Sequence, residues 1–74
     1  FGIDCITVDL PTPLRPKGFD FPVHRTLLGN NVLIAENVTN LGAVIGKRTR
    51  IMALPLRIKV SDAGHARIVA EILN

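Results

Sequence analysis

Short apolar stretches separated by turn-forming residues dominate this chain. Such stretches span residues 2–9, 32–38, 48–54, 56–60 and 67–73, and proline, glycine, asparagine or aspartate lies at most of their ends. Runs of this length that are rich in β-branched residues are typical of strands. The pattern predicts about five strands, with one or two of them formed by residues 48–60 on either side of Pro55.

One short helix is expected between the first two stretches. Pro22 suits the first turn of a helix, where a missing N–H costs no hydrogen bond, and Asp20 or Phe21 can cap it. Residues 29–31, Gly-Asn-Asn, supply the left-handed conformations that end helices. Together these features predict an α/β chain that is rich in strand and contains a single helix of about two turns.

The connections on either side of this helix differ in character. Residues 11–22 contain four prolines and Gly18, which favours a stiff loop without regular structure. Residues 39–46 predict a connection with a single helical turn at most. Stiff loops often line binding sites because they hold their side chains in place.

Length and cysteine content limit the class of protein. A chain of 74 residues has room for one domain or part of one. Cys5 is the only cysteine, so no internal disulfide can form, and a lone thiol is typical of intracellular proteins. No apolar run approaches the ~20 residues that a membrane-spanning helix requires. We therefore expect a cytoplasmic protein that does not contact membranes.

The charge is basic but dispersed. Nine lysines and arginines face six acidic residues, giving a net charge of +3, and only residues 47–50 form a basic cluster. Three phenylalanines are the only aromatic residues, few for stacking on bases. Alternate residues on a strand, such as Arg48 and Arg50 or Arg57 and Lys59, form an ordinary solvated face. We expect no specific nucleic-acid partner, and a basic nucleic-acid-binding module is the less favoured alternative.

Two residues carry candidate chemistry. With a period of two along residues 32–38, Glu36 shares a strand face with Val32 and Ile34, and a charge on an apolar face needs a partner or a metal. A hydrogen-bonded glutamate at a strand end fits equally well. His24 lies in the first turn of the helix, where a lone histidine is more often a surface residue. The spacing permits the two side chains to meet but does not require it, and a catalytic zinc usually needs three protein ligands.

Several short motifs, taken in order, resemble a known family. They are Gly2-Ile3-Asp4 with Thr7 and Asp9, His24, Glu36-Asn37-Val38-Thr39-Asn40-Leu41, Ala53-Leu54-Pro55-Leu56, and Gly64 with Arg67. Their order and spacing resemble the C-terminal part of the cyclase-like metal-dependent hydrolases, the family that contains bacterial kynurenine formamidase. The resemblance implies that residues 1–74 are the C-terminal part of one domain of the swivelling β/α type.

The resemblance also implies a function. His24 and Glu36 would be ligands of a divalent metal, zinc or manganese, with one or two ions, and the reaction would be hydrolysis of an amide or related acyl bond by a metal-activated water. The family's other ligands lie in an upstream motif, His-x-Gly-Thr-His-x-Asp-x-Pro, which this chain lacks. The expected partner is therefore the N-terminal portion of the same domain, without which the chain would be inactive and would not fold stably. A non-catalytic structural subunit or a degenerate relative is the alternative.

Further expectations concern the surroundings of this site. Arg15, Lys17 and Phe19 lie in the proline-rich loop and would help to shape the pocket for a small-molecule substrate. A homo-oligomer is also expected. His65 would lie in a plain loop, and Asn37, on the opposite strand face from Glu36, would be structural.

Overall fold

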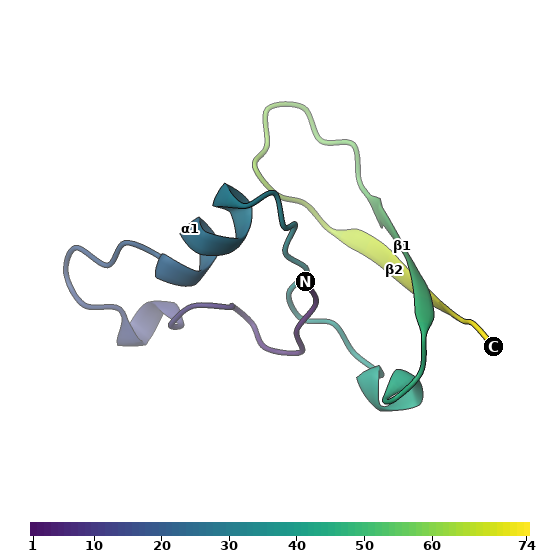
Figure 1. The fold of residues 1–74 in the computed structure, drawn as a ribbon. Helices are drawn as coiled ribbons and strands as arrows, with labels where there is room; N and C mark the ends of the chain where they lie inside the picture. Colours follow the sequence, from purple (N-terminus) through teal and green to yellow (C-terminus); the bar gives the residue numbers. More distant parts are fainter. The chain divides into compact units, whose positions relative to one another are not determined.

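The computed structural model describes residues 1–74, which divide into two units, Phe1–Thr39 and Asn40–Asn74. The chain is a small mixed α/β fold with one α-helix and one two-stranded antiparallel sheet. The elements, in order, are the 3₁₀ helix η1 (Thr12–Leu14), helix α1 (Pro22–Gly29), the 3₁₀ helix η2 (Leu41–Val44), strand β1 (Thr49–Pro55) and strand β2 (Ala66–Ile72) (Figure 1). The prediction of about five strands is therefore wrong in number. None of the helices is both long and apolar enough to span a membrane.

Helix α1 confirms the predicted helix. It begins at Pro22 and ends at Gly29, and Asn31 adopts the expected left-handed conformation with φ 61°. Its start is unusual because the preceding Phe21 has φ 53° and no residue beside the helix caps it with a side chain. The free N–H groups of the first turn are instead bound by Asp9, from the segment before the proline-rich loop. That loop contains one short turn, η1, where no regular structure was predicted.

The two apolar stretches of the first unit were predicted to be strands, and they are not. They do lie side by side in parallel: the amide of Ile3 donates to the carbonyl of Ala35 (3.0 Å), and the amide of Val38 donates to that of Ile3 (3.0 Å). Only Gly2 and Ala35 form a β-bridge. Asn37 has φ 57°, so the chain leaves the extended conformation there and no regular ladder forms, although the amide of Asn37 still donates to the carbonyl of Cys5 (2.9 Å). Cys5 lies in the first of these stretches and is exposed.

Strands β1 and β2 form a hairpin in the second unit. Met52 faces Val69 near its centre, and Pro55 faces Ala66 at one end. Beyond that end, the amide of Leu56 donates to the carbonyl of His65 (2.9 Å). Because hydrogen-bonded and non-hydrogen-bonded pairs alternate in antiparallel sheets, the Pro55–Ala66 pair belongs to the non-bonded class. Pro55 therefore costs the ladder no hydrogen bond, which explains how a proline fits within β1.

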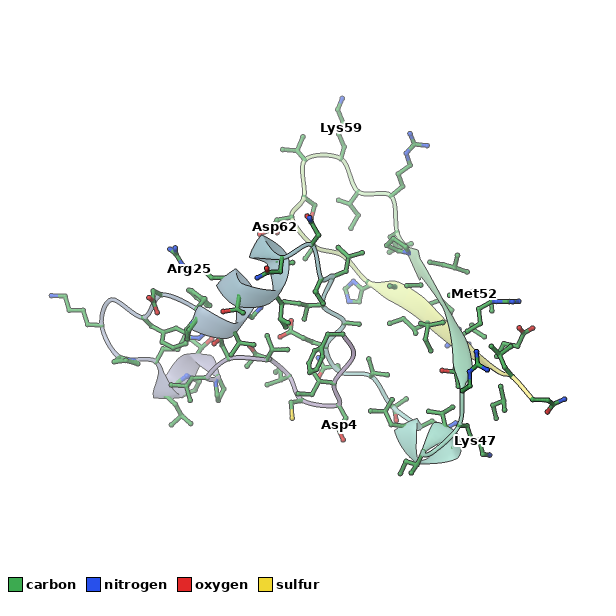
Figure 2. All side chains as sticks on the ribbon, viewed as in Figure 1. Asp4, Arg25, Lys47, Met52, Lys59 and Asp62 are labelled. Atoms are coloured by element: carbon green, nitrogen blue, oxygen red, sulfur yellow. The ribbon has the colours of Figure 1, made fainter.

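The connection between the strands replaces another predicted strand. Residues 56–60 belong to this connection, so Arg57 and Lys59 do not alternate on a sheet face. Lys59 and Asp62 both lie on it (Figure 2). Strand β2 lies within one residue of the stretch predicted at 67–73, and η2 confirms the single helical turn expected within 39–46. His65 lies in the connection, as predicted.

The chain has no buried apolar core. No apolar side chain is buried, and Leu33, Leu54 and Ile51 are 82%, 63% and 57% exposed. Hydrophobic burial is usually the largest stabilising contribution to folding. Within the first unit, specific polar contacts therefore hold many of the side chains in place.

Candidate functional site

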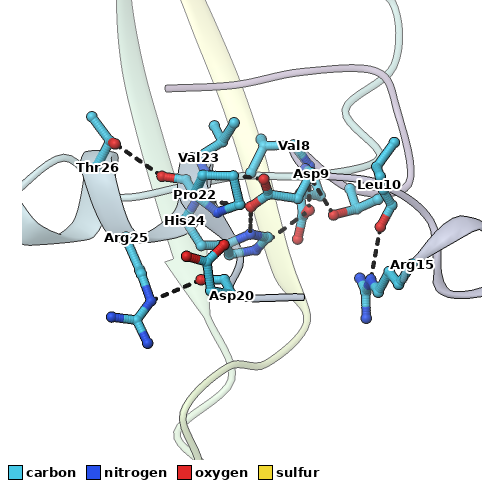
Figure 3. Close-up of polar contacts among 12 residues, drawn as sticks. Val8, Asp9, Leu10, Arg15, Asp20, Pro22, Val23, His24, Arg25 and Thr26 are labelled. Atoms are coloured by element: carbon cyan, nitrogen blue, oxygen red, sulfur yellow. Dashed lines mark hydrogen bonds and ion pairs between the residues drawn. The ribbon is translucent and has the colours of Figure 1, made fainter. Parts of the chain in front are cut away.

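Asp9 is the centre of the polar contacts in the first unit (Figure 3). Its Oδ1 accepts the amide of Val23 (3.0 Å), and its Oδ2 accepts the amide of His24 (2.9 Å). The same Oδ2 lies 2.7 Å from His24 Nδ1. The Asp9 side chain is 2% exposed. One carboxylate thus caps the start of α1 and fixes the ring of the histidine that this helix carries.

The environment of Asp9 favours its ionised form. Burial alone would raise the pKa of the carboxyl group, but hydrogen bonds from the amide and ring of His24 and from the amide of Val23 lower it, as does the charge of His24. The lowering effects together prevail, so the pKa of Asp9 lies below its ordinary value of 3.8. Asp9 is therefore an anion at neutral pH and accepts the hydrogen on His24 Nδ1.

His24 and Glu36 do approach each other. His24 Nε2 lies 3.9 Å from Glu36 Oε2, and the two side chains are 28% and 29% exposed. The amide of Val8 donates to the same Oε2 (2.9 Å) and holds the carboxylate in place. The parallel contact between the two apolar stretches brings Glu36 beside Val8, while Asp9 brings the first turn of α1 to the same place. The sequence spacing left this convergence open.

The donor set of this cluster fits part of a divalent metal site. Zinc binds imidazole nitrogen and carboxylate oxygen at about 2.0–2.2 Å in tetrahedral geometry, so two ligands of one ion lie about 3.4 Å apart. The 3.9 Å between His24 Nε2 and Glu36 Oε2 is somewhat longer, so both atoms could bind one ion after a small shift of the side chains. A carboxylate on the other ring nitrogen is the usual support of a metal-binding histidine. No group of three or more His, Cys, Asp or Glu side chains is arranged to hold a metal ion.

The predicted pocket residues do not all lie together. Arg15 is half-buried and lines an open depression whose other lining residues are Ile6, Thr7, Pro11, Thr12 and Pro13. Phe19 lies outside that lining and stacks edge-on against Phe21, with 5.0 Å between the ring centroids. Lys17 is exposed and is also absent from the lining.

Asp9 and Phe21 were not chosen as site residues from the sequence. Phe21 lies edge-on to the ring of His24 at 5.9 Å between centroids, and its ring also faces Arg15. Asp9 did appear among the motif residues that carry the family resemblance. The sequence did show that Asp9 is a carboxylate at the end of an apolar stretch. Its position along the chain, however, gave no indication that it contacts His24, fifteen residues later.

Comparison with known proteins found a relative of this chain. A curated, uncharacterized protein from Methanocaldococcus jannaschii is 39% identical over 70 residues, which are 93% of this chain and 35% of the relative. The chain thus spans about one third of the length of that relative. No protein-family model matches the chain, and no solved structure matches it significantly.

Proposed function

We propose that His24 and Glu36 are two ligands of a divalent metal in a hydrolase that cleaves an amide or related acyl bond. The observation that carries this proposal is the approach of His24 Nε2 to Glu36 Oε2 at 3.9 Å, with Asp9 holding the opposite ring nitrogen at 2.7 Å. The resemblance to the cyclase-like metal-dependent hydrolases supports the same assignment. Zinc or manganese, as one or two ions, is the proposed metal.

Each residue of the cluster has a distinct task in this proposal. Asp9 accepts the hydrogen on His24 Nδ1, so the neutral ring keeps its lone pair on Nε2, the atom that faces Glu36. Glu36 supplies an anionic oxygen that offsets the charge of a cation, and the amide of Val8 orients that oxygen. A bound divalent ion would lower the pKa of a coordinated water towards about 7 and polarise the substrate carbonyl.

Two ligands do not complete a catalytic site. We propose that the remaining ligands come from an N-terminal portion of the same domain, outside these 74 residues, and that the chain is inactive without it. A small-molecule substrate, a homo-oligomeric assembly and a cytoplasmic location belong to the same proposal. The match to the M. jannaschii protein supports this proposal, because the matched residues make up only 35% of that relative.

Metal analysis of the intact protein tests the assignment. We expect His24→Ala and Glu36→Gln each to remove most of the bound metal and to lower hydrolysis of an N-formyl anilide by more than about 100-fold, because loss of a ligand exceeds the 10- to 100-fold cost of losing an outer contact. His65→Ala and Glu71→Gln are matched controls and should change neither the amount of bound metal nor the rate of hydrolysis. Full metal occupancy in both ligand variants, measured by mass spectrometry, would remove the assignment.

The same samples distinguish a catalytic hydrolase from a non-catalytic structural subunit or a degenerate relative. Metal that depends on His24 and Glu36, together with no hydrolysis of formyl, acyl or cyclic amides by the unaltered protein, would favour a degenerate relative or a structural subunit.

A further inference from the structure

Arg15 lies near the surface but makes three contacts that hold its side chain in place. Its Nε donates to the carbonyl of Leu10 (2.8 Å), as Figure 3 shows. Its Cζ lies 4.6 Å from the centroid of the Phe21 ring and 5.7 Å from that of Phe19. One hydrogen bond and two aromatic rings thus restrain a side chain that would otherwise lose rotamer entropy on binding a ligand.

The charge of Arg15 has no partner within the chain. Close contacts between acidic and basic side chains join His24 to Asp9, His24 to Glu36, and Arg50 to Glu71. Arg15 takes part in none of them, and its only hydrogen bond uses Nε. A guanidinium that lies over an aromatic ring keeps the N–H groups along its edge available for a planar anion. Arg15 is therefore a restrained cation with two free nitrogens.

Arg15 also borders the depression described above. Ile6, Pro11 and Pro13 give this depression apolar walls, and Thr7 and Thr12 add hydroxyl groups. Small-molecule sites commonly combine mostly apolar walls with a few placed polar groups. All of these residues lie in the first unit.

Backbone strain coincides with this arrangement. Phe21 has φ 53° and ψ 60°, a left-handed conformation that is uncommon for a residue with a bulky side chain. Its ring lies between two functional groups, 4.6 Å from Arg15 Cζ and 5.9 Å from the centroid of the His24 ring. Strained residues that persist often do so at binding sites. The ring of Phe21 thus contacts the side chains of both Arg15 and His24.

We propose that Arg15 binds the carboxylate of a small molecule whose apolar part lies in the depression lined by Ile6, Pro11 and Pro13. A guanidinium can bind either a carboxylate or a phosphate through two parallel hydrogen bonds. Because Arg15 is the only cation that lines the depression and most of the other lining residues are apolar, a singly charged carboxylate with an apolar body fits it better. The inference deepens the proposed function by naming carboxylates as the substrate class. It rests on the proposed function for that role, while the binding itself does not depend on a metal.

Titration of the intact protein with benzoate and benzamide tests the binding without any variant. The two probes share a ring and differ in charge, so charge recognition should make benzoate bind at least tenfold more tightly. Benzoate should also shift the NMR signals of the Arg15 side chain. Equal affinities for the two probes would overturn the proposal, and so would tighter binding of inorganic phosphate than of benzoate.

Variants then locate the binding. Arg15→Lys keeps the positive charge but lacks the planar guanidinium group with its parallel N–H donors. We expect this variant to weaken benzoate binding at least tenfold. Arg25→Lys is the matched control, because Arg25 Nε also donates to a backbone carbonyl, that of Asp20 (2.7 Å), but no ring lies over Arg25. Unchanged binding in Arg15→Lys would overturn the proposal.

A chelator separates this inference from the metal site. Benzoate binding that survives metal removal supports Arg15 as the carboxylate site, even if the hydrolase proposal fails. Benzoate binding that disappears with the metal and is restored by adding it back would place the carboxylate on the metal, and the Arg15 proposal would be wrong while the metal site stood.

Discussion

The two units of the chain stabilise their backbones in different ways. In residues 1–39, few regular hydrogen bonds form, and single side chains such as Asp9 join segments that are distant in sequence. In residues 40–74, β1 and β2 share a continuous register from Thr49–Ile72 to Pro55–Ala66. The first unit is organised by a few side chains, and the second by many equivalent backbone bonds.

This contrast indicates where function can reside. A repeated ladder tolerates most side chains, because each bond is made by the backbone and adds only about 1 kcal/mol. A cluster in which one carboxylate accepts three contacts depends on a single residue, and it fixes the position of a chemically active ring. The candidate chemistry accordingly lies in the less regular unit. Four experiments test this contrast.

Asp9→Ala should have the largest effect. It removes the acceptor for the amides of Val23 and His24 and the partner of the His24 ring, so hydrogen exchange at those two amides should accelerate by roughly 10- to 100-fold. Asp20→Ala is the matched control, because Asp20 precedes the same helix and its side chain makes no hydrogen bond. Amides of the hairpin should keep their rates. Unchanged exchange at Val23 and His24 would show that the helix start does not depend on Asp9.

A proline in the ladder should have the next largest effect. Met52 pairs with Val69 in the hydrogen-bonded class, so Met52→Pro deletes one ladder bond and should accelerate exchange of the Val69 amide by about tenfold. Ala53→Pro places proline in the same non-bonded class as Pro55 and should cost less. Equal damage by the two variants would contradict the assigned alternation.

Acidification should loosen the first unit selectively. Because the pKa of Asp9 is lower in the fold than its ordinary value of 3.8, its stabilising contribution is present above pH 3.8 and is lost as the pH falls through the lower folded value. NMR signals of Val23 and His24 in metal-free protein should therefore change below about pH 4. Asp9→Asn should abolish that change. A transition of the same size in the asparagine variant would assign it to another group.

The Arg50–Glu71 pair should matter least. Arg50 Nη1 lies 3.0 Å from Glu71 Oε1 across the strands, but the side chains are 65% and 51% exposed. Exposed pairs of this kind contribute about 0.2–1 kcal/mol and are screened by salt. Glu71→Gln should lower the denaturation midpoint only slightly, and the difference should shrink as salt is added. A large loss that salt does not reduce would show that the hairpin also depends on single side chains.

Local sequence signals were reliable where a few adjacent residues decide the backbone. Pro22 and the Gly-Asn-Asn run gave the bounds of α1, and the stretch at 67–73 gave β2 to within one residue. The same signals failed at residues 2–9 and 32–38. Both stretches are rich in β-branched residues, but they form only one β-bridge, and Asn37 adopts a left-handed backbone conformation. A strand needs a neighbour along its whole length, which propensity does not supply.

The residue types of the candidate site, a histidine in the first turn of a helix and a glutamate twelve residues later, follow from the sequence alone, as does the family resemblance that contains them. The fold was needed to show that His24 and Glu36 meet, that Asp9 contacts the histidine ring, and that Phe21 lies against Arg15. The reason is geometric. Helix and strand periods specify which face a side chain occupies, whereas the distance between two faces depends on how the chain returns on itself.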